Sequence, residues 1–437
     1  MALNNLDLKS FGELEKILYG GEDSTSYFNK ETRKCTSFSQ IPVEMKKVNG
    51  TANFGYTWSV VIDKEFGDYF LSSWICIKFP EILLKENNSI GSSGRIRWTE
   101  NLLHNVIEEC TLTFNDLVIS KLDNFSLDIL SEYTIPKNKY SKYMEQIGNI
   151  DELQKPSTYL PSRNLFLPLP MFFSKDTGNS IPLTSLPHTE IRINFKFRNW
   201  ENLLILENCT SVNTNVMVPS VGKDLREIPK LVSAKLFCNF SIVSEEERAK
   251  MGIKHKTIII EQLHTSPRQM IINDESVKMD LLFKQSVKTL FFGIRNTTYK
   301  NVWSNYTSGN SMYKGTYFYK QNNKEDIASE AGIFYNNKER VPMLPIQFFQ
   351  FINPWFHAEC TPTKVGLYMY SFALHQNQPD PMGSTALCRI DNPYILIKLS
   401  DNCKKAIKNG ESFELNVVCE SYTAIQIKEG LASYCFP

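Results

Sequence analysis

The chain of 437 residues carries almost no net charge, because 48 basic side chains balance 47 acidic ones. A protein that wraps nucleic acid without sequence preference needs a basic excess or a basic tail, and this chain has neither. Residues Met1 to Asp7 lack the basic start and apolar core of a signal peptide, and no apolar run approaches the roughly 18–20 residues that span a bilayer. We therefore expect no direct contact with nucleic acid, no export signal and no membrane-spanning helix.

Motifs for enzyme chemistry are missing as well. No two of the ten cysteines stand two to four residues apart, as zinc ribbons require, and neither a phosphate-binding loop nor a serine nucleophile elbow occurs. His357-Ala-Glu359 begins like a zinc-deaminase site, but the following Cys360-Thr-Pro cannot complete that motif. We predict no catalytic residue, no metal and no cofactor. We interpret His357 as a hydrogen-bonded loop or strand histidine, and the cysteines as free, mostly buried thiols in a reducing cytosol.

Charged side chains offer few candidate sites. Carboxylates are plentiful, which leaves a glycosidase pair open, but no pair stands apart from the others. We interpret Glu108-Glu109 and Glu245–Glu247 as solvated positions. The cluster of Lys404, Lys405 and Lys408 is interpreted as a turn that serves solubility.

Alternation of apolar and polar residues dominates the rest of the chain. In Ile191–Phe197 every second residue is apolar, with Arg, Asn and Lys between them, which predicts a strand with one face in a core. Further runs of this kind are Tyr56–Ile62, Ile75–Phe79, Val232–Ile242, Val277–Phe283 and Phe413–Cys419. Many short strands with few helices predict an all-β fold of antiparallel sandwiches.

Helical and loop signals divide the chain. We expect helices at Asn124–Ser131 and Ser244–Lys250, a linker at residues 218–229 and a long exposed loop at residues 297–340. The length suits two sandwiches of about 200 residues each. The predicted organisation is therefore an N-terminal arm at residues 1–21, a first sandwich at 22–222 and a second at 223–437.

Short runs in nearly every part of the chain share their order with one protein family. The runs are Phe11–Gly21, Thr25–Phe28, Ala52–Gly55, Gly67–Leu71, Arg97–Asn101, His104–Ile107, Thr113–Asp116, Leu167–Gly178, Ile181–Leu183, Glu190–Phe195, Ser244–Arg248, Arg295–Thr298, Ser304–Thr307, Asn353–Trp355, Tyr370–Leu374 and Asp380–Thr385. In this order they resemble the major capsid proteins of nucleocytoplasmic large DNA viruses, most closely those of iridoviruses and ascoviruses. Leu167–Gly178 carries the most weight, and the shared order makes the resemblance specific.

The resemblance implies that both sandwiches are jelly rolls and that three chains form a pseudo-hexagonal capsomer of an icosahedral shell. It further implies a place in the virion after assembly in the host cytoplasm, other copies and minor capsid proteins as partners, and no catalytic residue. Two alternatives stay open. One is a capsid paralogue that scaffolds membrane without entering the virion. The other is a carbohydrate-binding or hydrolytic jelly-roll protein.

The N-terminal arm is expected to hold one short helix, with a capping box at Ser10–Glu13 and an end at Gly20-Gly21. Such a helix is unstable alone in water, so it should dock against something. Two hypotheses have equal weight: it covers its own first jelly roll, or it lies on the inner face of the capsomer. There it would contact minor capsid proteins or the internal membrane of the virion, and its near-neutral charge favours protein over lipid. The candidate contact residues on its apolar side are Phe11, Leu14, Ile17 and Leu18.

Overall fold

The computed structural model describes residues 34–209, 216–251, 256–272, 275–309 and 326–435, together with Tyr19, Ser26 and Phe28. The chain divides into two compact units, Met1–Ser37 and Phe38–Pro437. All elements given below belong to the second unit. The helix predicted in the N-terminal arm lies outside the described residues.

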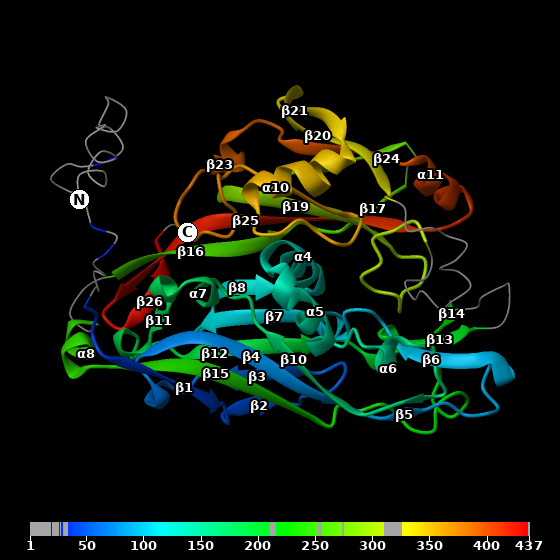
Figure 1. The fold of residues 1–437 in the computed structure, drawn as a ribbon, viewed down its shortest axis with the longest axis horizontal. Coiled ribbons are helices and arrows are strands. Elements are labelled where there is room, and N and C mark those ends of the chain that lie inside the picture. The colour runs from blue at the N-terminus through cyan, green and yellow to red at the C-terminus, as the bar shows by residue number, and fades with distance from the viewer. Residues whose placement is uncertain are drawn as a thin grey trace, which may run out of the picture. The chain divides into compact units, whose positions relative to one another are not determined.

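The first jelly roll consists of two five-stranded antiparallel sheets around one apolar core (Figure 1). One sheet has the order β1-β15-β4-β10, with β11 beside β4: β1 Phe38–Glu44, β15 Ser233–Val243, β4 Tyr69–Phe79, β10 Arg163–Pro168 and β11 Ile181–Pro182. The other has the order β2-β3-β12-β7-β8: β2 Val48–Gly50, β3 Thr57–Val61, β12 Ile191–Phe197, β7 Ile107–Phe114 and β8 Leu117–Leu122. Two small sheets flank them, β14-β13-β6 (Val216–Met217, Leu204–Asn208, Gly94–Trp98) and β5-β9 (Ile82–Leu83, Tyr159–Leu160).

The second jelly roll has a seven-stranded and a four-stranded antiparallel sheet around a second core. The larger sheet has the order β16-β25-β19-β22, joined by β17, β23 and β26: β16 Lys256–Thr265, β25 Phe413–Lys428, β19 Ser286–Asn296, β22 Leu367–Ser371, β17 Gln269–Met270, β23 Thr385–Ala386 and β26 Leu431–Tyr434. The smaller sheet has the order β18-β24-β20-β21: Ser276–Asp280, Tyr394–Leu399, Ala328–Tyr335 and Lys338–Pro345. In Figure 1 these strands, drawn largely in yellow to red, lie above the blue to green first jelly roll.

Helices occur mainly in the connections. They are α3 Leu102–Val106, α4 Asn124–Thr134, α5 Lys137–Gln146, α6 Asp151–Gln154, α7 Phe172–Lys175, α8 Glu245–Met251, the π-helical turn η6 Phe348–Ile352, α10 Asn353–His357 and α11 Asp401–Lys408. Short 3-10 turns are η1 Lys64–Phe66, η2 Gly91–Ser93, η3 Thr177–Asn179, η4 Leu183–Ser185, η5 Trp200–Asn202 and η7 Leu387–Arg389. The two predicted helices are confirmed as α4 and α8. Helix α5 was not predicted, because seven of its ten residues are polar; Tyr143 and Met144 are half-buried against the first core.

Alternation predicted the strands well. In β12 the apolar positions Ile191, Ile193, Phe195 and Phe197 are all buried, whereas Arg192, Asn194 and Lys196 point away from the core. Trp58 of β3 stacks on Phe195 and Phe197 from the neighbouring strand. Cross-strand aromatic pairs of this kind are a main source of sheet stability, so this sheet is formed by the pattern that predicted it.

One predicted alternation is wrong at both ends. Val232–Ile242 was expected to place both Val232 and Ile242 in the core, but both are exposed and Val243 is buried. The pairing of β15 with β4 shifts register between Asn239 and Phe240. The extra residue at this shift is Leu71 of β4, so the bulge inverts the alternation of β4. Strand β15 keeps its own alternation through Phe240 and loses it only in its last three residues.

Strand β15 also lies beyond the expected start of the second jelly roll at residue 223. It pairs with β1 and β4 and so belongs to a sheet of the first jelly roll. Helix α8 follows it and leads to β16, the first strand of the second jelly roll. Arg248 of α8 is tied to Asp68, at the start of β4, by an ion pair of 2.7 Å.

The expected long loop at residues 297–340 is wrong in its outer parts. Residues 302–307 are buried, and residues 328–345 form the hairpin β20-β21. Asn, Tyr, Lys and Gly in this stretch suggested an exposed loop, but several of these polar groups bond to the first jelly roll instead. Residues 310–325 lie outside the described part.

Candidate functional site: the seam between the jelly rolls

Strand β25 has two buried faces. Phe413, Leu415, Val417 and Cys419 point into the core of the second jelly roll, as the alternation predicted. Glu414, Asn416 and Glu420 were expected on the opposite, polar face. They are buried too. We call the contact of β16, β19 and β25 with α4 and α7 the seam.

Helix α4 is the apolar wedge of the seam. Asp123 caps its start in a capping box with Ser126. Phe125, Ile129 and Tyr133, four residues apart, share one face of the helix. They pack against four side chains of the second jelly roll, Phe291, Leu367, Met369 and Val418, and against Tyr306. Leu127 and Leu130 belong to the core of the first jelly roll, so α4 contributes to both sides.

Glycine permits this close approach. A Cβ atom at Gly293 of β19 would lie 2.9 Å from the carbonyl oxygen of Gly366 and 3.2 Å from the ring of Phe125. Contacts that short force a neighbour to move, and the carbonyl oxygen is backbone. Position 293 must therefore stay without a side chain where α4 meets the sheet.

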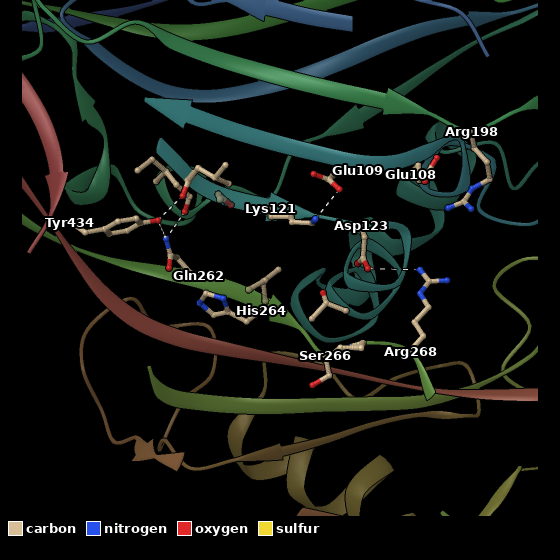
Figure 2. A pocket seen from close by; sticks show the side chains of 16 residues that line it. Glu108, Glu109, Lys121, Asp123, Arg198, Gln262, His264, Ser266, Arg268 and Tyr434 are labelled. Atoms are coloured by element: carbon tan, nitrogen blue, oxygen red, sulfur yellow. Dashed lines mark hydrogen bonds and ion pairs between the residues drawn. The ribbon is translucent and has the colours of Figure 1, made fainter. Parts of the chain in front are cut away.

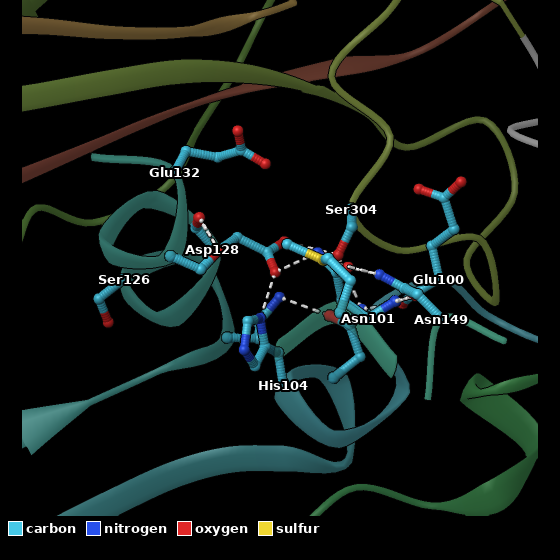
Figure 3. Close-up of polar contacts among 12 residues, drawn as sticks. Glu100, Asn101, His104, Ser126, Asp128, Glu132, Asn149 and Ser304 are labelled. Atoms are coloured by element: carbon cyan, nitrogen blue, oxygen red, sulfur yellow. Dashed lines mark hydrogen bonds and ion pairs between the residues drawn. The ribbon is translucent and has the colours of Figure 1, made fainter. Parts of the chain in front are cut away.

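The polar side of α4 is organised by Asp128 (Figure 3). One carboxylate oxygen accepts hydrogen bonds from Asn101 (2.6 Å) and from Nδ1 of His104 (2.7 Å). The other accepts from the hydroxyls of Ser304 (2.5 Å) and Tyr306 (2.9 Å). Burial alone would raise the pKa of Asp128, but the groups around it, first His104 and then Lys364 and Ser304, together lower the pKa. The carboxylate therefore stays charged and joins α3, α4 and the stretch 304–306.

Trp303 anchors the same stretch in the first jelly roll. Its indole nitrogen donates to the carbonyl oxygen of Asn202 at 2.7 Å. The guanidinium groups of Arg198 and Arg295 each lie 3.6 Å from the centre of a Trp303 ring. Two such groups cannot share one face at that distance, so the indole is held between them. One arginine comes from each jelly roll, which makes this cation–π stack a bridge across the seam.

A cluster of four buried charges forms another part of the seam. Lys175 of α7 reaches across to Glu261 of β16, at 2.6 Å, and to Glu420 of β25. Lys288 of β19 pairs with Glu261 and donates to the carbonyl oxygen of Gln378 at 2.6 Å. Burial lowers the pKa of Lys175, but the charges of Glu420 and Glu261 raise it overall. Two lysines and two glutamates thus balance inside the protein, which is the condition for burying charges at tolerable cost.

A groove of about 660 Å³ opens between β8 and β16 at the seam (Figure 2). Its polar groups bond to each other: Lys121 pairs with Glu109 at 2.8 Å, and Gln262 donates to Tyr434 at 2.6 Å. His264, also in the lining, forms a hydrogen bond of 2.7 Å with the side chain of Gln285. Tyr434 is the one aromatic side chain among the lining residues. The groove therefore lacks both a nucleophile–base pair and the aromatic floor that a sugar site needs.

The other candidate positions have structural roles. His357 bonds to the carbonyl oxygen of Leu374 at 3.0 Å, but it ends helix α10 and is neither a loop nor a strand residue. Lys404, Lys405 and Lys408 lie on α11, where a turn was expected. Glu108 and Glu109 pair with Lys196 and Lys121.

The cysteines, possible metal ligands and helices were also compared with the predictions. All ten cysteines are free thiols, and five of them are buried. The described residues hold no group of three His, Cys, Asp or Glu side chains placed to bind a metal. Among them, no helix is long and apolar enough to cross a membrane. The candidate arm residues Phe11, Leu14, Ile17 and Leu18 lie outside the described part.

The polar seam residues were missed because each is ordinary on its own. A signal was nevertheless present. Asn101, His104, Lys175, Ser304 and Tyr306 all fall inside runs that carried the family resemblance. Polar residues inside such runs, in segments without catalytic spacing, indicate buried contacts.

Family models and known proteins match this chain over most of its length. Residues 26–251 match the family model described as the major capsid protein N-terminus, and residues 247–433 match the large eukaryotic DNA virus major capsid protein. The major capsid protein of Invertebrate iridescent virus 6 is 38% identical over 413 residues, which cover 91% of this chain and 88% of that protein. That of Simulium iridescent virus is 36% identical over 446 residues, covering 98% and 94%. Among solved structures, a quasi-atomic model of the PBCV-1 virus capsid matches with a TM-score of 0.74 at 16% identity, over 94% of this chain and 100% of that chain.

Proposed function

The chain belongs to the family of large eukaryotic DNA virus major capsid proteins, and we propose that it assembles as trimeric, pseudo-hexagonal capsomers that tile an icosahedral shell. As a major capsid protein it is a structural component of the virion capsid and not an enzyme. Other copies of the chain are its first partners. Minor capsid proteins are the further partners that we propose, with assembly in the host cytoplasm.

The observation that supports the trimer best is the seam. It joins two similar lobes into one body through a shared apolar cluster, a cation–π bridge and balanced buried charges. Three chains related by a threefold axis then present six lobes in fixed positions. A threefold object can occupy a lattice site with six neighbours only if the two lobes keep their relative orientation.

Light scattering on the purified full-length chain tests the trimer. The expected mass is three times the chain mass of 50.3 kDa, and electron micrographs should show six lobes around one axis. A folded protein that stays monomeric at micromolar concentrations contradicts the proposal.

Mass spectrometry of purified virions separates the shell protein from a membrane scaffold. A major capsid protein must dominate the particle by mass, whereas a scaffold paralogue must be depleted from it. The comparison is quantitative, because each capsomer contributes three copies.

The N-terminal arm is proposed to act on the inner face of the capsomer through Phe11, Leu14, Ile17 and Leu18. Its apolar stripe and low charge favour a minor capsid protein over the internal membrane. Deletion of residues 1–18 should leave folding and trimers intact but prevent complete particles. Loss of trimers would instead assign the arm to the capsomer itself.

The division between the two jelly rolls is proposed to fall between β15 and β16, at residues 244–255. Strand β15 pairs inside the first jelly roll, and the two family matches meet at residues 247–251. The proposed boundary lies later in the chain than the expected residue 222. Limited proteolysis of a variant with a protease site inserted after Met251 should yield two fragments that remain associated through the seam.

A further inference from the structure

The helical run from Phe348 to His357 is apolar on both sides. Phe349 is fully buried in the second core and packs against Phe292 with ring centres 5.5 Å apart. The opposite side exposes four further apolar residues at positions i, i+1, i+4 and i+5, and Leu374 lies beside the end of the helix. We call this surface the α10 patch: Phe351, Ile352, Trp355, Phe356 and Leu374. A helix that is apolar all round is normally covered all round.

The α10 patch is large and rigidly held. Trp355 is 75% exposed and Phe356 is 66% exposed. Aromatic side chains bury about 150–250 Å² each, so covering the three aromatic residues would remove on the order of 350 Å² from water. That is nearly half of the roughly 800 Å² that each partner contributes to an interface of standard size. Asn353, on the inner side, holds the helix to β22 by accepting from the backbone of Ser371 at 3.0 Å.

The surroundings of the α10 patch identify the kind of partner. No Asp, Glu, Lys or Arg occurs between Arg340 and Glu359. Nucleic acid and anionic lipid are attracted by clustered basic residues, and peripheral membrane helices carry them on their polar face. An uncharged aromatic surface fits a permanent protein interface, which is more apolar than a transient one. In a self-assembling protein such a surface must be covered before capsomers accumulate in solution, or they would aggregate through it.

We propose that the α10 patch is covered by a second copy of this chain within the capsomer. This inference rests on the proposed trimer and adds the surface by which its subunits meet. A threefold contact is head-to-tail, so the α10 patch meets a different surface of the next copy. Contacts between capsomers can then be weaker, because many act together in the shell.

Paired substitutions test the assignment. W355S/F356S removes the centre of the α10 patch, and I272S/L282S removes two apolar residues that are 93% and 83% exposed elsewhere on the second jelly roll. We expect W355S/F356S to weaken trimerisation about 100-fold or more, as central aromatic contacts do, and I272S/L282S to leave it within a few-fold of wild type. Circular dichroism and the unfolding midpoint of the monomer should be unchanged in both, because the replaced side chains are solvated there.

The outcomes separate this inference from the proposed function. If wild type is trimeric and W355S/F356S is equally trimeric, the α10 patch is not the subunit contact, although the capsomer proposal stands. If wild type is monomeric, the capsomer proposal itself fails. If W355S/F356S does not fold, the conservative W355F and F356L variants should restore both folding and trimers. In that case the single variants W355A and F356A replace the pair, and folded single variants that trimerise as wild type does would overturn the assignment.

Photo-crosslinking identifies what covers the α10 patch. Benzoylphenylalanine at position 355, in trimers assembled from light and ¹⁵N-labelled chains, should give peptides that join light to heavy chains. Crosslinks confined to residues 1–37 of the same chain would show that the N-terminal segment covers the α10 patch. Preferential crosslinking to neutral phosphatidylcholine vesicles would show a membrane contact. Either result overturns the proposal.

Discussion

Strand β25 meets the apolar core of the second jelly roll on one face and the first jelly roll on the other. Leu415 and Val417 are packed among hydrocarbon side chains, whereas Glu414 and Glu420 are buried among lysines and arginines. The apolar face gains stability in proportion to the area it buries, with little preference for direction. Each charge on the other face is tolerable only while its partner stands in place. We infer that the cores provide most of the stability and that the seam specifies one orientation of the lobes.

The largest effect is expected at Glu420. Glu420→Ala should destabilise the protein by about 3–5 kcal/mol, because it leaves a buried lysine charge without its partner. Chemical denaturation measures the change. In the matched double variant Lys175→Met/Glu420→Gln, the Lys288–Glu261 pair stays balanced, so the loss should be smaller than for Glu420→Ala alone. If the double variant loses as much stability as the single variants Lys175→Met and Glu420→Gln lose together, the two charges act independently.

Leu415 lies on the other face of β25, in the apolar core of the second jelly roll. Leu415→Ala should cost about 3 kcal/mol through lost burial and a residual cavity. Unlike Glu420→Ala, this variant should keep the two lobes in their native orientation, which small-angle scattering can check. A change in lobe orientation with Leu415→Ala would remove the distinction between the two faces.

Asp128 should make the contribution of the seam to stability depend on pH. Its folded-state pKa is below the ordinary value of 3.8, so its contribution is present above that value and is lost as the pH falls through the folded pKa. Stability of wild type should therefore decline below about pH 4. Asp128→Asn should cost about 1–3 kcal/mol at pH 7 and flatten this acid dependence. Asp116→Asn, at an exposed carboxylate, serves as the control, and equal slopes for both variants would contradict the role of Asp128.

The end of β15 gives the smallest effect. Ile242→Ser should change stability by about 0.5 kcal/mol or less, whereas Val243→Ser should cost about 1–2 kcal/mol. Strict alternation predicts the reverse order. Thermal unfolding of the two variants decides between the two registers.

Local patterns predicted most strands because the alternation of apolar and polar residues shows directly which side of a strand faces a core. Ile191–Phe197 shows this. The inverted end of β15 was not predictable, since nothing in the local sequence marks where the alternation stops. Helix α5 was missed although Tyr140, Tyr143 and Met144 recur at helical spacing, because polar residues dominate the segment.

The sequence by itself determined the all-β class, the two-lobed organisation and the family, since these depend on periodicity, length and the order of many short runs. Only the tertiary structure decided that Asp128, Lys175 and Glu420 lie in a seam, that β15 belongs to the first jelly roll, and that Trp355 lies on an exposed apolar surface. The physical reason is distance along the chain. Lys175 and Glu420 are 245 residues apart, so no window of sequence contains both members of the pair.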